Sequence, residues 1–194
     1  MSRIAVFFPG IGYTMDRPLL HFSRRLAAEM DYEIKPITYG GFPQQVRGDR
    51  GKMEECFRLA LRQSVEFLGD VDLTAYDDIL FIGKSVGTIV AACLASQSAA
   101  RERIRSVLYT PLEDTFTFRL SEAIAFTGGN DLWVGGKESR IATLCAARNI
   151  PCTVIPDANH SLETNDVQKD IETLREVMER TRQFIVRRID KAIE

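Results

Sequence analysis

The sequence predicts an α/β protein: a single three-layer domain over residues 1–194, in which a mostly parallel sheet of about six strands has helices on both faces. Two observations support this prediction. Short apolar runs rich in β-branched residues alternate with longer segments of helical period, as expected when crossover helices join parallel strands. Hydrophobic residues make up 45% of the 194 positions, which is enough for one well-formed core.

The apolar runs are predicted to be strands buried on both faces, because helices are expected above and below them. In chain order they are Ile4–Phe8, Ile34–Tyr39, Ile79–Ile82, Ser106–Tyr109, Ala123–Thr127 and Cys152–Ile155.

Helices are predicted between these runs. Asp16 is expected to cap a first helix that begins at Arg17–Pro18 and has an apolar stripe of Leu19, Phe22, Leu26 and Met30. Further helices are expected over Lys52–Leu68, directly after Ser85, near Asp114–Leu120, and over Glu138–Arg148. The last helix has an apolar stripe of Val167, Ile171, Leu174, Met178, Ile185 and Ile189. The irregular stretch Gly40–Gly51 is predicted to cover a binding site.

The overall composition excludes several classes of partner. A formal net charge of −2 leaves no basic footprint for nucleic acid, and no apolar stretch approaches the ~20 residues that span a bilayer. We therefore expect a small-molecule partner. The first residues lack the features of a signal peptide, so we expect a cytoplasmic protein. The four cysteines show no metal-ligand or disulfide spacing, and no metal site is expected. The oligomeric state is not predicted.

The segment Gly83-Lys84-Ser85-Val86-Gly87 lies where a predicted strand meets a predicted helix. A serine on such a turn has a strained backbone and a projecting hydroxyl, and the flanking glycines avoid collisions with the strand and helix. The pattern Gly-x-Ser-x-Gly is short and recurs by chance, but its position strengthens it. Ser85 is therefore predicted to be a nucleophile.

A serine nucleophile needs a base, and the base needs a third group that orients it. Of the two histidines, His21 lies within a predicted helix and is expected at the surface. His160 follows the last predicted strand, on the same sheet edge as Ser85, and is the predicted base.

The acid is expected after another strand. Asp131 follows two glycines that let the chain turn back towards His160, and it is the predicted acid. Asp114, after the preceding strand, is an alternative for that role, and Asp131 could instead be an exposed turn residue.

The negative charge that develops on a substrate carbonyl needs preorganised donors, usually backbone N–H groups. The N–H of Val86, at the start of the helix after Ser85, is one predicted donor. The second is expected from the turn after the first strand, from Ile11 or else from Gly12, although this turn could have no binding role.

These motifs resemble the α/β-hydrolase superfamily over nearly the whole chain. The matching segments are the Pro9–Gly12 turn, the Gly83–Gly87 nucleophile elbow, the Gly128–Asp131 acid turn and the Asn159–Ser161 base loop. The order Ser85, Asp131, His160 is that of the family. The resemblance implies a catalytic triad of these residues and no cofactor.

The chain also departs from the family pattern. It lacks the usual first hairpin and an inserted cap domain, so it is similar to the small dienelactone-hydrolase-like group. Pro9 replaces a histidine of the family's first turn, and Lys84 occupies an elbow position often held by an aromatic residue or histidine.

The sequence thus predicts a serine hydrolase that cleaves a small carboxylic ester or thioester through an acyl-enzyme. Tyr13, Phe42 and Trp133 are candidates for the substrate wall, although each could serve only in packing. The alternative is a non-catalytic interaction or regulatory protein that retains the hydrolase fold. The tripeptide Gly83-Lys84-Ser85 also ends the phosphate-binding loop of some nucleotide-binding proteins. That loop needs a glycine at the position of Asp78, so the sequence argues against a phosphate-binding loop.

Overall fold

The computed structural model describes residues 1–191, with side chains through residue 187. Its centre is a sheet of six strands in the order β2-β1-β3-β4-β5-β6, and every neighbouring pair is parallel. The predicted fold class and parallel sheet are confirmed. The strands are β1 (Arg3–Phe8), β2 (Glu33–Pro36), β3 (Asp78–Lys84), β4 (Ile104–Tyr109), β5 (Glu122–Gly128) and β6 (Cys152–Ile155).

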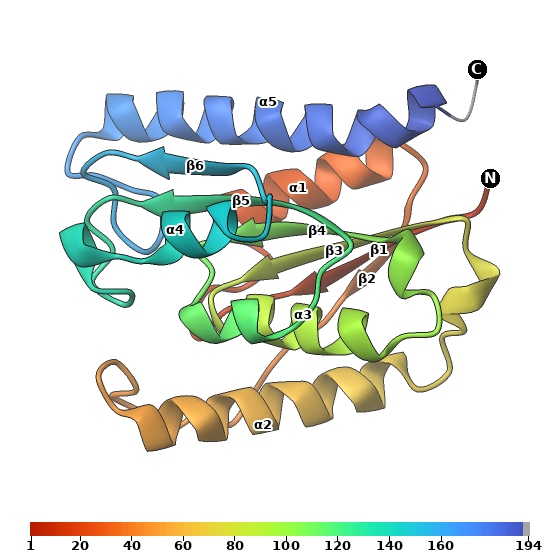
Figure 1. Ribbon diagram of the computed structural model, residues 1–194, viewed down its shortest axis with the longest axis horizontal. Coiled ribbons are helices and arrows are strands. Elements are labelled where there is room, and N and C mark those ends of the chain that lie inside the picture. The colour runs from red at the N-terminus through yellow and green to blue at the C-terminus, as the bar shows by residue number, and fades with distance from the viewer. Residues whose placement is uncertain (192–194) are drawn as a thin grey trace.

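Helices cover both faces of this sheet (Figure 1). They are α1 (Pro18–Glu29), α2 (Arg50–Leu68), α3 (Val86–Gln97), α4 (Ile141–Ala146) and α5 (Val167–Lys191). The helices α1 and α5 pack on one face, whereas α3 and α4 pack on the other and α2 lies outside α3. No helix within residues 1–191 is long and apolar enough to cross a membrane.

Successive side chains along the buried strands point alternately into the two cores, one on each face of the sheet. In β1, Ala5 and Phe7 pack towards α1 and α5, while Val6 and Phe8 pack on the opposite face. Because side chains of a strand alternate, Leu80 and Ile82 of β3 lie on the α1–α5 face together. All strands run in one direction, so the loops that follow β1, β3, β5 and β6 meet at one edge of the sheet.

Two predictions about α1 are wrong. Its N-cap is Arg17, with no side-chain hydrogen bond, and Asp16 does not cap it. Pro18 begins the helix without needing a side-chain cap, because its own missing N–H removes one of the donors that a cap would satisfy. Phe22, expected on the apolar stripe, is 39% exposed.

Other boundaries also differ from the prediction. The strand predicted to reach Tyr39 ends at Pro36, which has no N–H for the ladder. The segment near Asp114–Leu120 is a 3₁₀ helix over Glu113–Thr117. The helix expected from Glu138 begins only at Ile141, after a separate 3₁₀ turn over Gly136–Glu138 that follows the left-handed Gly135.

The apolar stripe of α5 does not reach the core along its whole length. Val167 is 69% exposed and Ile171 is 58% exposed, because the helix begins beyond the edge of the core that buries Val177 and Ile185. The side chain of Ile189 lies outside the described part of the chain.

Candidate active site

Ser85 occupies a sharp turn between β3 and α3. Its backbone has φ 56° and ψ −125°, a conformation that residues other than glycine rarely adopt. The two flanking glycines allow the turn to pack closely: a Cβ on Gly83 would lie 2.8 Å from Thr88 Cα, and one on Gly87 would lie 2.0 Å from Phe8 O. This is the strand–turn–helix geometry predicted for the segment.

The structure brings Ser85, His160 and Asp131 into one hydrogen-bonded chain. His160 Nε2 lies 2.8 Å from Ser85 Oγ, and His160 Nδ1 lies 2.7 Å from Asp131 Oδ2. Asp131 is fully buried, and its Oδ1 accepts a hydrogen bond from Trp133 N at 2.9 Å. A carboxylate held in this way orients the imidazole, with Nδ1 as donor to Asp131 and Nε2 free to accept the Ser85 proton.

Two loops position the imidazole. Gly128 lets the loop after β5 approach the base loop, because a Cβ there would lie 2.2 Å from Ala158 O. In the base loop, Asn159 Oδ1 accepts from Ser161 N at 2.7 Å. The Trp133 ring stacks on the His160 ring, with 5.2 Å between centroids and 24° between planes. The orientation of His160 is therefore fixed by its hydrogen bonds and by an aromatic neighbour.

The other candidates for acid and base lie elsewhere. Asp114 is exposed in the 3₁₀ helix after β4, where its carbonyl accepts a hydrogen bond from the Thr117 hydroxyl. His21 is half-buried on α1 and makes an edge contact with Phe22. No hydrogen bond, ion pair or ring contact joins either residue to Ser85 or His160, although Asp114 lines the cavity of about 480 Å³ on the α2 side.

The turn that carries two of the predicted N–H donors lies beside Ser85, and the third donor belongs to the residue after Ser85. A Cβ on Gly10 would lie 3.2 Å from Ser85 Cβ, so the turn after β1 contacts the elbow directly. The amides of Ile11 and Gly12 have no acceptor among residues 1–191. Val86 is the first residue of α3, where an N–H has no intrahelical partner. No acceptor within residues 1–191 therefore binds the N–H groups of Ile11 and Gly12, and that of Val86 has no intrahelical partner.

Burial controls the electrostatics of the site. Burial lowers the pKa of His160 below its ordinary value, the hydrogen bond to Asp131 opposes that change, and the charge of Lys84 adds to it. The pKa of the Lys84 ammonium falls to about 7, mainly through burial, with Asp131 and Glu163 opposing the change. A neutral imidazole at neutral pH is the form that a general base requires.

An apolar cluster extends from the elbow on the α2 side. It contains Val86 with Ile11, Phe42, Met53 and Trp133. Beyond it lies a cavity of about 480 Å³, which shares Val46, Met53 and Trp133 with the cluster and is also lined by Leu112. Phe42 and Trp133 therefore lie on this side of Ser85.

Tyr13 lies apart from those two predicted wall residues. Its hydroxyl accepts a hydrogen bond from Leu19 N at 3.1 Å, and its side chain is 5% exposed. It lines a separate cavity of about 170 Å³ next to Leu162 and Leu174. The structure does not bring Tyr13 together with Phe42 and Trp133.

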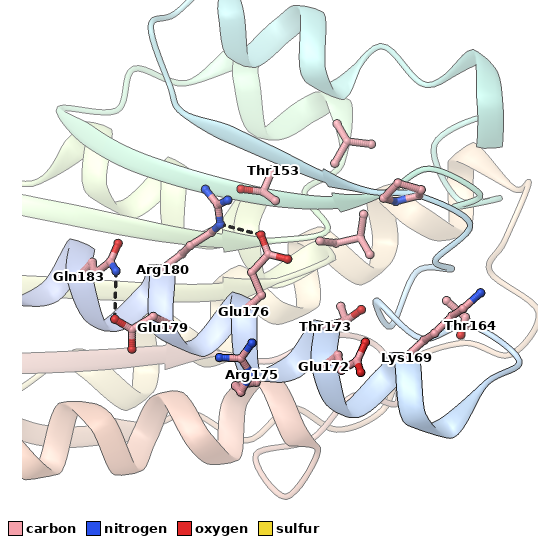
Figure 2. Close-up of a pocket in the computed structure, with 13 residues that line it drawn as sticks. Thr153, Thr164, Lys169, Glu172, Thr173, Arg175, Glu176, Glu179, Arg180 and Gln183 are labelled. Atoms are coloured by element: carbon pink, nitrogen blue, oxygen red, sulfur yellow. Dashed lines mark hydrogen bonds and ion pairs between the residues drawn. The ribbon is translucent and has the colours of Figure 1, made fainter.

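A larger cavity, of about 890 Å³, lies away from Ser85 between the edge strand β6 and α5 (Figure 2). Its walls are mainly polar side chains of α5, some of which already pair along the helix. Arg180 Nε lies 2.9 Å from Glu176 Oε1, and Gln183 donates to Glu179. None of its lining residues belongs to the Ser85 chain of hydrogen bonds, so we do not assign the reaction to it.

Sequence reasoning missed the burial of Lys84. Only part of the signal was local: Lys84 follows Leu80 and Ile82 at steps of two, but the predicted strand ended at Ile82, and β3 extends to Lys84. Over residues 1–191, no group of three or more His, Cys, Asp or Glu side chains could hold a metal ion.

No protein-family model matches the sequence, and no curated protein matches it either. The structure is nevertheless similar to solved structures. An esterase from Pyrococcus furiosus is 15% identical with a TM-score of 0.64, and the match covers 96% of this chain and 83% of that one. Dienelactone hydrolase from Anabaena variabilis is 15% identical with a TM-score of 0.62, covering 94% of this chain and 84% of that one.

A third similar structure, an α/β serine hydrolase without a lid from Xanthomonas campestris, is 16% identical with a TM-score of 0.58 and covers 95% of this chain and 84% of that one. At these identities the similarity concerns the fold. The protein therefore has the α/β-hydrolase fold, in a small form similar to dienelactone hydrolase and to a serine hydrolase without a lid. This confirms the resemblance drawn from the sequence motifs.

Proposed function

We propose that this protein is a serine hydrolase that cleaves a small carboxylic ester or thioester through an acyl-enzyme. The observation that carries the proposal is the hydrogen-bonded chain from Ser85 through His160 to Asp131, with distances of 2.8 and 2.7 Å. A nucleophile, a base and an orienting acid are the groups that acyl transfer needs. Similarity in fold to esterases adds support for hydrolase chemistry.

In the proposed acylation step, Ser85 Oγ attacks the substrate carbonyl carbon while His160 Nε2 takes the hydroxyl proton. Asp131 holds the imidazole in position and stabilises its protonated form. His160 then gives the proton to the leaving alcohol or thiol as the carbonyl–oxygen or carbonyl–sulfur bond breaks. An ester between Ser85 and the acyl group remains.

Deacylation repeats these roles with water. His160 takes a proton from water, the resulting hydroxide attacks the acyl carbon, and the proton returns to Ser85 Oγ as the carboxylic acid leaves. In both steps the substrate oxygen carries negative charge. We assign its stabilisation to the N–H groups of Val86 and Ile11, with Gly12 as the alternative to Ile11.

The cavity on the α2 side is the proposed place for the acyl group or leaving group. Its volume of about 480 Å³ lies within the usual range for small-molecule sites, and Trp133 connects it to His160. It is open to solvent along a charged rim that includes Asp49, Arg50 and Glu138. We therefore expect short or slender acyl groups to react faster than long ones, with the segment 40–51 as the cover.

The proposal is tested by the hydrolysis of p-nitrophenyl esters from acetyl to palmitoyl. Wild-type protein should hydrolyse the short esters fastest, and Ser85→Ala should reduce the rate to the background without loss of folded structure by circular dichroism. Ser121→Ala is the matched control, because Ser121 is exposed and its hydroxyl donates only to Glu102, at 3.4 Å. Wild-type rates in Ser85→Ala would exclude Ser85 as nucleophile, and an inactive wild type would favour the non-catalytic alternative.

A further inference from the structure

Lys84 is the last residue of β3 and directly precedes the proposed nucleophile. Leu80 and Ile82 pack in the core shared with α1 and α5, and by alternation Lys84 lies on the same face. Its side chain is 1% exposed. The lysine is thus enclosed beneath the loops that carry the acid and the base.

The surroundings of the ammonium are unusual for a buried charge. Lys84 Nζ lies 4.9 Å from the centroid of the Tyr13 ring. Within the described part of the chain, no group accepts a hydrogen bond from this ammonium and no carboxylate forms an ion pair with it. A cation over an aromatic face is attracted to it, but that attraction replaces only part of the lost hydration.

Lys84 directly precedes Ser85, whose hydroxyl lies 2.8 Å from His160 Nε2, and His160 Nδ1 lies 2.7 Å from Asp131 Oδ2, so charged and titratable groups from three loops lie near Lys84. Asp131 comes from the loop after β5, and both His160 and Glu163 come from the loop after β6. Tyr13 comes from the loop after β1, and the Arg17 guanidinium lies 5.6 Å from the centroid of the same ring. Attraction from Asp131 and Glu163 keeps the pKa of Lys84 from falling below about 7.

An ammonium that is largely removed from water and has no protein acceptor destabilises a fold, and a methionine at this position would fit the same space without that cost. Groups of this kind concentrate at functional sites. Because Lys84 directly precedes Ser85 and its charge attracts Asp131, we expect its role to lie in the Ser85–His160–Asp131 site.

We propose that Lys84 is a positioning residue of the Ser85–His160–Asp131 site: its buried positive charge attracts the Asp131 carboxylate and repels a second positive charge on His160. The proposal rests on the proposed hydrolase function and deepens it. Lys84 does not contact the substrate. While Lys84 is protonated, an added proton on His160 is disfavoured, so the imidazole stays available as a base. The contribution of Lys84 to the lowered pKa of His160 agrees with this arrangement.

The first test measures His160 itself and needs no enzymatic activity. The two histidines of the chain allow imidazole titrations to be followed by NMR, with His21 as an internal control. In Lys84→Met the midpoint of His160 should rise by about one pH unit, which is the lower end of the shifts that a nearby charge produces in proteins. Lys35→Met, which removes a lysine paired with Glu33 on β2, should leave it unchanged. An unchanged or lower midpoint in Lys84→Met would overturn the proposal.

The second test separates this role from a structural one. Lys84 has a pKa of about 7 in the folded protein and 10.5 as an ordinary lysine. Between these values the unfolded chain binds more protons, so wild-type stability should increase as the pH rises through this window. Lys84→Met should lose that dependence and melt at a higher temperature than wild type at pH 7. At pH values below the His160 midpoints of both wild type and Lys84→Met, the kcat/KM of Lys84→Met should be about tenfold lower than that of wild type. A midpoint one unit higher leaves about one tenth as much neutral imidazole at such a pH.

If the role of Lys84 were structural, its replacement by methionine would lower the stability and leave the pH profile unchanged. Lower stability or failure of Lys84→Met to fold would overturn the proposal, as would an unchanged pH profile of kcat/KM. The outcomes also separate the two proposals. A shifted His160 midpoint in a protein that hydrolyses no ester would support the role of Lys84 in the site and reject only the hydrolase reaction.

Discussion

The two ends of β3 carry buried charges on the same side of the sheet, but only the charge at the first residue is paired by hydrogen bonds. At the first residue, Asp78 is fully buried and accepts hydrogen bonds from Arg105, with Nη2 lying 2.9 Å from Oδ2 and Nε lying 3.2 Å from Oδ1. Arg105 also donates to Phe184 O at 2.7 Å, and the Tyr32 hydroxyl donates to Asp78. At the last residue, Lys84 Nζ lies 4.9 Å from the centroid of the Tyr13 ring, and within the described residues it has no hydrogen bond or ion pair.

We interpret this difference as one between a structural charge and the functional charge proposed for Lys84. Asp78 and Arg105 satisfy each other and join β3, β4 and α5, whereas the Lys84 charge has no hydrogen-bonded partner in residues 1–191. In parallel α/β sheets, ligands bind at the carboxyl ends of the strands, which is the end that Lys84 shares with Ser85. We infer that the amino end of β3 is organised for stability and the carboxyl end for chemistry.

The largest effect is expected at the carboxyl end. Asp131→Asn should lower kcat for p-nitrophenyl acetate by about 10⁴, the scale seen when an orienting carboxylate is neutralised and the base adopts the wrong tautomer. The fold should survive, since asparagine nearly matches aspartate in volume. Asp114→Asn is the comparison and should have a milder effect, because Asp114 is exposed and has no hydrogen bond to His160, although it lines the proposed substrate cavity. A severe loss in Asp114→Asn with normal activity in Asp131→Asn would transfer the acid role to Asp114.

A smaller effect, on stability alone, is expected at the amino end. Arg105→Met removes the cation that pairs with Asp78 and should lower the free energy of unfolding by about 3–5 kcal/mol, measured by urea denaturation. The rate per folded molecule should stay near that of wild type, because Arg105 lies at the opposite end of the strands from Ser85. Arg101→Met is the control, since Arg101 is 60% exposed and surface pairs contribute about 0–1 kcal/mol. A loss of kcat in folded Arg105→Met would contradict the division between the two ends.

Residues that carry local signals were predictable from the sequence. The elbow around Ser85 needs a strand, two glycines and a helix in immediate succession, and all are visible in the chain. The loops of Asp131 and His160 each follow an apolar run, so the topology of a parallel sheet already places them at the same edge as Ser85. The parallel direction of the strands followed from the same alternation, whereas their order in the sheet was not predicted.

Features that depend on distant parts of the chain were not predictable. Nothing near Trp133 indicates that its ring stacks on His160, because the contact joins two separate loops. Val167 and Ile171 fit a helical stripe, yet they lie beyond the edge of the core, whose extent is set by the strands and α1. Asp16 has the chemistry of a helix cap, but Pro18 sets where α1 begins. The burial of Lys84 likewise depends on three loops that close over it.

The central claim, that Ser85 is the nucleophile of a serine hydrolase, is tested most directly by intact-protein mass spectrometry after reaction with a fluorophosphonate. We predict that wild-type protein gains the mass of one phosphonyl group, that peptide mapping assigns it to Ser85, and that Ser85→Ala gains none. An unlabelled wild type, or a label on any residue other than Ser85, would contradict the claim.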